Sequence, residues 1–208
     1  LPAAVEAPIL SPLTSSSSTV LMVGFTSATR TPMEQRTFVD WVVRPRILAT
    51  PGVAKVAVFG GDVRQLQVLA DPVRLRAHGL SLADVVDAAG RASNVRGAGV
   101  LDDPNQRIVV RTEGQLGTPA ALGGSVLRAT PGSVLRLRDV ATVREGPETK
   151  FGDGSINGGP GIVLVVSGQL GSNTKEVASA VARVLHALGP AIAAEGLVLH
   201  PDLFRPSA

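Results

Sequence analysis

Ile162-Val163-Leu164-Val165-Val166 is the most strand-like run in the chain. A short apolar run rich in β-branched residues predicts a buried strand. Asn173-Thr174-Lys175-Glu176 follows closely and is a capping box, which predicts the start of a helix. The apolar stripe of that helix consists of Val177, Val181, Val184, Leu185 and Leu188. Residues 197–200 then predict a closing strand, so this end of the chain is a strand–helix–strand unit.

The beginning of the chain has the same order of elements. Thr19–Phe25 (TVLMVGF) predicts a strand buried on both faces. A second capping box, Thr31-Pro32-Met33-Glu34, has proline at the first helical position. The helix is expected to end or kink near Pro45. The side chains that it is expected to turn inward are Phe38, Trp41 and Val42.

A strand is predicted over Val53–Phe59, after the break at Pro51-Gly52. The compact turn Gly60-Gly61-Asp62 leads into Val63–Leu69 (VRQLQVL), which indicates a hairpin with that strand. The rest of the middle section is predicted as short mixed elements. These are a helical turn from Asp71-Pro72 to Gly79, a helix from Ser81 to about Ser93 with Val85, Val86 and Ala89 on its apolar face, a loop over Gly97–Asn105, a strand over Arg107–Thr112, a brief helix at Thr118-Pro119, strands near Val126 and Val134, a strand over Leu137–Arg144 and a turn over Gly152–Gly161.

The order of these elements predicts an α+β fold, an α/β sandwich with helices packed against a sheet. The two strand–helix–strand halves are expected to close into one ferredoxin-like βαβ-βαβ subdomain. We therefore predict a first part over residues 1–64, an inserted mixed α/β subdomain over 65–145 and a second part over 146–208. Residues near Val20 and Val165 must then lie in the same sheet.

Composition excludes several classes of protein. The 208 residues are 44% hydrophobic and 18% charged, which is typical of a folded domain. Twenty Lys and Arg against 17 Asp and Glu give a net charge of only +3, and aromatic residues make up 3%. Nucleic-acid binding is not expected, because it needs a concentrated basic face or a stacking platform. The absence of cysteine excludes disulfides and iron–sulfur clusters.

No segment predicts a membrane span or a signal peptide. Unbroken apolar runs such as Ile162–Val166 are far shorter than the roughly 20 residues of a spanning helix. Leu1-Pro2-Ala3-Ala4 lacks the charged segment and apolar core of a leader. The start at Leu1 and an end at Ala208 without a helix-ending signal lead us to expect that the chain is part of a longer protein.

A series of short motifs is informative through its order and spacing, although no one of them is specific. They are Ser15–Gly24 (SSSSTVLMVG), Asp40–Arg46 (DWVVRPR), Pro51–Val53, Phe59–Gln65 (FGGDVRQ), Asp71-Pro72, Gly79–Ser81, Arg138–Ala141 and Asn157-Gly158. Together they resemble the N-terminal periplasmic half of efflux pumps of the resistance-nodulation-division superfamily, over essentially the whole chain. The tryptophan–arginine and double-glycine motifs look closest to the heavy-metal cation branch. The tetraserine strand is also similar to the drug-exporting branch, so both substrate classes stay open.

The resemblance implies a porter subdomain that forms part of a substrate cleft, and an inserted docking subdomain that builds the exit funnel of a homotrimer. It implies a proton-driven antiporter in the bacterial inner membrane, with this chain as a periplasmic portion that does not itself insert into the membrane. The implied partners are other subdomains of the same pump, a periplasmic adaptor and an outer-membrane channel. The family's proton-carrying residues lie in transmembrane helices, outside this chain.

The resemblance also gives candidate residues for the substrate cleft. Met22 follows the serines, and its thioether is a suitable ligand for monovalent copper or silver. Thr19 matches a cleft position that is aromatic in drug exporters, Phe59 matches another pocket position, and Phe151 is added by proximity. For Met22 and Phe59 the alternative is ordinary core packing.

The loop Gly97–Asn105 matches a docking-subdomain loop that reaches the neighbouring protomer. The candidate contact residues are Gly97, Gly99, Asp102, Asp103 and Asn105. The alternatives are a solvated hairpin loop and, for the two aspartates, simple turn chemistry.

Catalytic, metal and cofactor sites have no support in the sequence. His78, His186 and His200 have no suitably spaced partners, whereas zinc needs three or four converging ligands. Gly152–Gly161 lacks the Lys-Ser/Thr ending of a phosphate loop, and no Gly-x-Ser-x-Gly elbow is present. We therefore expect no enzyme and no cofactor. A free-standing periplasmic module for a metal or small ligand remains the alternative to a transporter segment.

Overall fold

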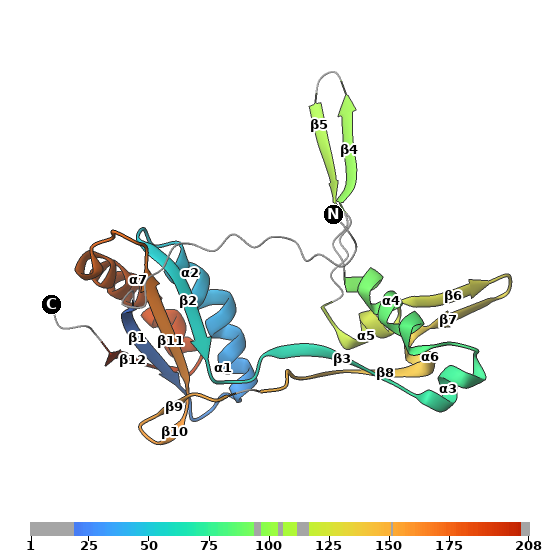
Figure 1. The fold of residues 1–208 in the computed structure, drawn as a ribbon, viewed down its shortest axis with the longest axis horizontal. Coiled ribbons are helices and arrows are strands. Elements are labelled where there is room, and N and C mark those ends of the chain that lie inside the picture. The colour runs from blue at the N-terminus through green and yellow to red at the C-terminus, as the bar shows by residue number, and fades with distance from the viewer. Residues whose placement is uncertain (1–18, 94–96, 104–105, 112–116, 151, 205–208) are drawn as a thin grey trace. The chain divides into compact units, whose positions relative to one another are not determined.

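The fold was obtained as a computed structural model that describes residues 19–93, 97–103, 106–111, 117–150 and 152–204, with the backbone alone for 93, 97–103 and 106–111 (Figure 1). The chain forms two compact units. Unit 1 consists of residues 1–64 and 147–208, and unit 2 of residues 65–146. Each is described by itself.

Unit 1 is built on one four-stranded sheet in the order β12-β1-β11-β2, and all neighbouring strands are antiparallel. The strands are β1 (Thr19–Thr26), β2 (Val53–Phe59), β11 (Ile162–Gly168) and β12 (Val198–Phe204). One helical segment follows β1 and another follows β11, which gives the ferredoxin-like order. Met22 pairs with Val165, so the predictions of an α+β fold and of one shared sheet are confirmed.

The first helical segment consists of α1 (Pro32–Phe38), a π-helical turn η1 (Val39–Val43) and α2 (Arg44–Leu48). Its capping box forms as predicted: the Thr31 hydroxyl accepts the Glu34 N–H at 3.3 Å, and Glu34 accepts the Thr31 N–H at 2.8 Å. Of the predicted end or kink near Pro45, the end is wrong, because proline lies in the first turn of α2 and the helix continues to Leu48. The kink is not contradicted, since the π-helical turn η1 lies directly before Arg44 and such turns bend helices.

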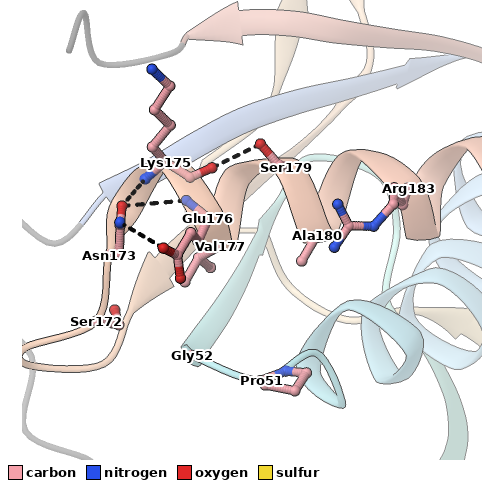
Figure 2. Close-up of a pocket in the computed structure, with 10 residues that line it drawn as sticks. All are labelled: Pro51, Gly52, Ser172, Asn173, Lys175, Glu176, Val177, Ser179, Ala180 and Arg183. Atoms are coloured by element: carbon pink, nitrogen blue, oxygen red, sulfur yellow. Dashed lines mark hydrogen bonds between the residues drawn. The ribbon is translucent and has the colours of Figure 1, made fainter.

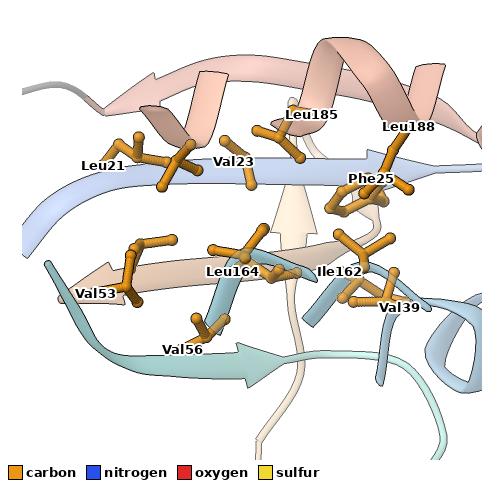
Figure 3. Close-up of a cluster of buried hydrophobic side chains, with 14 of the residues drawn as sticks. Leu21, Val23, Phe25, Val39, Val53, Val56, Ile162, Leu164, Leu185 and Leu188 are labelled. Carbon is orange, nitrogen blue, oxygen red and sulfur yellow. The ribbon is translucent and has the colours of Figure 1, made fainter. Parts of the chain in front are cut away.

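The core of unit 1 lies between one face of the sheet and the helices (Figure 3). Helix α7 (Thr174–Ala194) contributes its predicted stripe, in which Val184 packs at the edge. The buried residues are Val20, Leu21, Val23, Phe25, Val39, Val43, Ile47, Val53, Val56, Ile162, Leu164, Val166, Val177, Val181, Leu185, Leu188, Ile192 and Leu197.

The predicted inward position of Trp41 is wrong, because its side chain is 79% exposed. The fully buried positions of this helix are Val39, Val43 and Ile47, which recur every fourth residue. Trp41 lies midway between two of them and therefore on the opposite side. Phe38 and Val42 are partly buried against the core.

Helix α7 is, within the part of the chain that the structure describes, the one helix long and apolar enough to span a membrane by length and composition. Five of its residues, from Val177 to Ile192, are buried in the core of unit 1. Its apolar character is thus explained by packing against the sheet.

Unit 2 has a smaller core of Leu75, Leu80, Val85, Ala88, Leu122, Leu137 and Val140. Its two-stranded sheets are β3-β8, β4-β5 and β6-β7. The elements are β3 (Arg64–Ala70), α3 (Pro72–Ala77), α4 (Leu82–Ser93), β4 (Gly97–Asp103), β5 (Gln106–Arg111), α5 (Pro119–Gly123), β6 (Val126–Thr130), β7 (Ser133–Arg136), α6 (Leu137–Val140) and β8 (Ala141–Pro147).

The predicted hairpin between residues 53–59 and 63–69 is wrong. Strand β2 pairs with β11, whereas β3 pairs with β8. Gly60 and Gly61 both have positive φ, and the Asp62 N–H is bound to the Pro32 carbonyl at 3.3 Å. These three residues therefore lead the chain out of the sheet instead of folding it back.

Three smaller predictions in the middle section also differ from the structure. The predicted loop over residues 97–105 is a strand, β4, as far as Asp103. The predicted strand over 137–144 begins with the helical turn α6, because the Asp139 carboxylate accepts the Arg136 N–H at 2.7 Å. Val86 is 61% exposed, since Val85 and Ala88 are the positions of α4 that face the core.

Candidate functional site

The outer face of the unit 1 sheet, opposite the helices, carries the residues that alternate with the core positions. Cross-strand partners in an antiparallel sheet point to the same face. Leu164 of β11 is fully buried, so its neighbours Val163 and Val165 point away from the helices. On β12 the register places His200 and Phe204, the partners of Gly24 and Met22, on the outer face. On β1, β11 and β2 it defines the outer face as Thr19, Met22, Gly24, Lys55, Ala57, Phe59, Val163, Val165 and Ser167.

These nine residues form three rows across strands β1, β11 and β2. The first row is polar and consists of Thr19, Ser167 and Lys55. The second row is apolar and consists of Met22, Val165 and Ala57. The third row consists of Gly24, Val163 and Phe59, which is 55% exposed. The outer face therefore changes from polar to apolar along the strands.

The hairpin of β9 (Ser155–Ile156) and β10 (Gly159–Pro160) closes the apolar end of the outer face at Gly24. A Cβ atom at Gly24 would clash with Ile156 and lie 2.8 Å from Leu203 Cδ1. Ile156 is only 5% exposed, so the glycine provides the space that this side chain fills. The predicted turn at residues 152–161 is thus a tight hairpin, in which Asn157 and Gly158 have positive φ.

Three of the four cleft candidates from the sequence, Thr19, Met22 and Phe59, lie together on the outer face. Phe151 lies outside the described residues. Sequence reasoning missed the other six, which are Gly24, Lys55, Ala57, Val163, Val165 and Ser167. The signal that could have found them is the alternation of buried and half-buried residues around Leu164. The sequence does not reveal this alternation, because the residues at the centre of β11 are apolar on both faces.

Of the candidates for an inter-protomer contact, Gly97, Gly99, Asp102 and Asp103 lie in β4, and Asn105 lies outside the described residues. Strand β4 pairs with β5 in a two-stranded sheet, in which Asp102 is the register partner of Arg107.

A charged cluster lies beyond Phe59, around a pocket of about 390 Å³. Lys150 Nζ lies 2.8 Å from Asp62 and 3.1 Å from Asp153. The hydrogen bond that Lys150 Nζ donates to Asp62, followed by the one that it donates to Asp153, raises the pKa of Lys150. The bond from Lys150 and the Gly154 N–H lower the pKa of Asp153. Both aspartates are thus engaged by the ammonium group, which leaves them poorly suited to holding a metal cation.

A wider pocket of about 770 Å³ lies at the start of α7 (Figure 2). Figure 2 shows the Asn173 side chain turned back onto the first helical turn, where its Oδ1 accepts the N–H groups of Lys175 at 3.0 Å and Glu176 at 3.4 Å. Two of the backbone donors at this helix end are therefore already used by the cap.

Within the described residues, no three histidine, cysteine or acidic side chains converge on a possible metal position. His200 is bound to Thr26 Oγ1 through its Nε2 at 2.8 Å, beside the Gly24 end of the outer face. The geometry favours an apolar contact surface with one polar edge over a metal centre or a catalytic site.

The comparisons with known proteins agree on one family. The model of the AcrB/AcrD/AcrF family matches residues 1–199. The chain is 32% identical over 151 residues to the cobalt-zinc-cadmium resistance protein CzcA of Cupriavidus metallidurans, which covers 73% of this chain and 14% of that protein. It is 35% identical over 158 residues to the cation efflux system protein CusA of Escherichia coli K12, with 74% and 15% covered. It is 30% identical over 170 residues to the nickel and cobalt resistance protein CnrA of C. metallidurans, with 82% and 16% covered. The chain thus spans 14–16% of the length of these curated relatives.

Proposed function

Because the chain belongs to the AcrB/AcrD/AcrF family, we propose that it is a periplasmic segment of a proton-driven inner-membrane exporter and that its outer face forms one wall of the substrate cleft. The resemblance to heavy-metal efflux pumps is confirmed by the relatives, which are named as resistance and cation efflux proteins. The chain accordingly has the role of a transporter segment and not of an enzyme.

The observation that carries the cleft assignment is the position of Thr19, Met22 and Phe59. They come from two strands separated by the whole first helical segment, and the register places all three on the outer face. Phe59 and the half-buried Met22 and Val165 expose apolar surface at the centre of the sheet, which a soluble domain normally covers with a partner or ligand. A cleft between this face and another subdomain of the same pump provides that cover.

Heavy-metal cations are the proposed cargo of the whole pump, because the relatives are named for cobalt, zinc, cadmium and nickel resistance. A drug or hydrophobic-compound exporter is the second candidate, and the apolar second and third rows of the outer face favour it. In both cases unit 1 moves as a rigid body and the energy comes from elsewhere in the protein.

Unit 2 is the proposed docking subdomain of a homotrimer that meets a periplasmic adaptor and an outer-membrane channel. The support from this chain is the β4-β5 hairpin, which forms a sheet of two strands among the residues that the structure describes. A two-stranded hairpin is marginally stable in water, so contact with a neighbouring protomer would stabilise it. Deleting residues 99–105 from the whole pump should weaken the trimer, and unchanged trimer stability would refute this contact.

The cargo is tested with the whole pump in a bacterial host that lacks its own metal exporters. We expect greater tolerance of at least one of cobalt, zinc, cadmium, nickel, copper or silver salts than with an empty vector. Unaltered tolerance of all six, with the pump present in the membrane, would overturn cation export. Repeating the assay with hydrophobic antibiotics tests the second candidate.

The cleft wall is tested with Phe59→Asp and a matched control, Leu170→Asp, in the same host. Leu170 is 69% exposed in the turn before α7 and has no register partner on the outer face. Phe59→Asp should reduce efflux at equal protein level, whereas Leu170→Asp should not. Equal effects of the two substitutions would argue against the outer face as the wall.

A further inference from the structure

Two connections join unit 1 to unit 2, and they lie side by side where they leave unit 1. The outgoing connection (residues 60–63) leads from β2 to β3, and the returning connection (residues 148–150) follows β8. The Glu148 N–H donates to the Val63 carbonyl at 2.8 Å, which pairs the two connections directly. Both connections belong to unit 1.

Helix α1 holds the outgoing connection in place. The Asp62 N–H donates to the Pro32 carbonyl at 3.3 Å, and the Arg36 guanidinium donates to the Gly60 carbonyl at 2.7 Å. Arg36 is itself paired with Asp40 at 2.6 Å, and their side chains are only 15% and 21% exposed. The outgoing connection is therefore anchored in the folded body of unit 1.

Lys150 joins the returning connection to this anchor. Its Nζ lies 2.8 Å from Asp62 on the outgoing connection and 3.1 Å from Asp153, three residues further along its own segment. The bond to Asp62 thus crosses from one connection to the other, whereas the bond to Asp153 is local. The Gly61 N–H also interacts with Asp153, but this contact is the smallest of the causes that lower the pKa of the aspartate.

We propose that Asp62 and Lys150 form a latch that holds the two connections together at their exit from unit 1. With the latch closed, both connections are fixed to α1, and bending between the units is confined to the two-stranded ribbon β3-β8 beyond it. With the latch open, the hydrogen bond between Glu148 and Val63 loses its ionic support, and bending extends back into residues 60–63 and 148–150. The latch thus sets the position of the hinge, which the proposed function does not address.

Residue-specific amide hydrogen exchange in the 208-residue chain tests the latch. The Glu148 N–H reports directly on the pairing of the two connections. Lys150→Met keeps a long side chain without its charge and should speed exchange of this amide about two- to five-fold, the range expected for a partly exposed ion pair. The amides of Leu122 and Val177, which are bonded within α5 and α7, should exchange at the wild-type rate in a folded variant.

The two aspartates provide a matched pair of variants. Asp62→Asn should speed exchange of the Glu148 amide as much as Lys150→Met does. Asp153→Asn should leave the rate near that of the wild-type chain, because asparagine keeps an oxygen acceptor for the neighbouring N–H groups. Lys175→Met controls for the loss of one positive charge, since Lys175 is exposed and has no ion-pair partner among the described residues.

Charge reversal distinguishes the ion pair from a general effect of substitution. Lys150→Glu brings a third carboxylate next to Asp62 and Asp153 and should speed exchange more than Lys150→Met does. Adding Asp62→Lys to Lys150→Glu restores opposite charges on the two connections and should recover part of the protection. High salt should bring the wild-type chain closer to Lys150→Met, because the pair is partly exposed.

An unchanged rate for the Glu148 amide in Lys150→Met would overturn the latch. Equal effects of Asp62→Asn and Asp153→Asn, or no recovery in the charge-reversed pair, would overturn it as well. Exchange in the chain does not depend on export, so the proposed function is measured separately by efflux from cells. A whole pump that exports nothing would refute the transport assignment, while the expected exchange rates would still support the latch.

Discussion

Met22 on β1 and Val165 on β11 are direct cross-strand partners, although all of unit 2 lies between them in the sequence. They belong to the two central strands of the sheet, so the core of unit 1 needs both halves of the chain. Unit 2 is therefore an insertion that leaves unit 1 after β2 and returns before β11. Formation of this sheet must bear the entropy cost of closing a long loop, which rises only slowly with its length.

Leu164 and Val165 are adjacent on β11 and point to opposite faces of the sheet, so substituting each in turn tests the assignment of the two faces. Leu164 is fully buried among the helices, whereas Val165 is half-buried on the outer face. Leu164→Ala should lower the free energy of unfolding by about 2–5 kcal/mol, as cavities in packed cores do. Val165→Ala should cost less than about 1.5 kcal/mol. Urea denaturation measures both, and equal losses would mean that the assignment of the two faces is wrong.

The overall fold of unit 1 could be predicted because its signals are local. The capping box at Thr31, the side-chain cap at Asn173 and the apolar stripe of α7 each depend on residues within a few turns. The hairpin between residues 53–59 and 63–69 could not be judged in this way. The choice between a return into the sheet and an exit depends on the hydrogen bond from the Asp62 N–H to the distant Pro32 carbonyl.

Alanine substitutions at Gly60 and Gly158 distinguish the energetic cost of backbone strain from the cost of close packing. Both have positive φ, 82° and 81°, so alanine is strained at either position. Nothing lies within 4 Å of a Cβ atom at Gly158, whereas at Gly60 it would clash with the Gly161 carbonyl and lie 2.8 Å from the Gly154 amide nitrogen. Gly158→Ala should cost about 1–2 kcal/mol of unfolding free energy. Gly60→Ala should lower the free energy of unfolding clearly more in the same urea titration. Similar losses for the two variants would show that the backbone around Gly60 can shift to make room for a methyl group.

Trp41 is the only tryptophan of the chain and reports directly on its exposure. Its emission maximum should lie near that of free tryptophan and shift little on unfolding. Arg44 and Arg46 are exposed nearby and have no ion-pair partner among the described residues, so iodide should quench more efficiently than caesium at equal ionic strength. Arg44→Gln should reduce the iodide effect and leave acrylamide quenching unchanged. Blue-shifted, unquenched emission would place the indole in a core.

Metal binding by the chain alone is expected to be weak. The described residues contain no converging set of three acidic, histidine or cysteine ligands, and Asp62 and Asp153 are paired with Lys150. Calorimetric titration with copper, silver, zinc and cobalt ions should show nothing tighter than the millimolar range, roughly −4 kcal/mol. Micromolar binding would instead favour a free-standing carrier. Met22→Leu then decides whether the thioether is a ligand.

The candidate site was only partly predictable for a physical reason. Met22 and Phe59 were found through a resemblance, whereas Lys55 and Val165 belong to the same surface only because β2 and β11 are neighbours. The order of strands in a sheet is a property of the whole fold and cannot be predicted from the sequence of any one strand. Lys55 taken alone in the sequence is an ordinary solvated charge, and its meaning depends on the apolar rows beside it.

The stability that the first capping box contributes should depend on pH through the carboxylate of Glu34. Its carboxylate accepts the Thr31 N–H and the Thr31 hydroxyl, at 2.8 and 2.9 Å, and the bond to the backbone N–H is the larger cause of its lowered pKa. A lowered pKa stabilises the folded state above the pKa of glutamate in the unfolded chain, and this contribution is lost as the pH falls through the lower, folded value. Glu34→Gln should therefore reduce stability most near neutral pH, and the difference from the wild-type chain should disappear at acid pH. Thr31→Ala removes the hydroxyl group that donates to the Glu34 carboxylate. The loss of stability caused by Glu34→Gln should therefore depend less on pH in the Thr31→Ala variant than in the wild-type chain. Urea midpoints between pH 3 and pH 7 measure the effect, and a difference independent of pH would mean that the ionised carboxylate does not stabilise the helix.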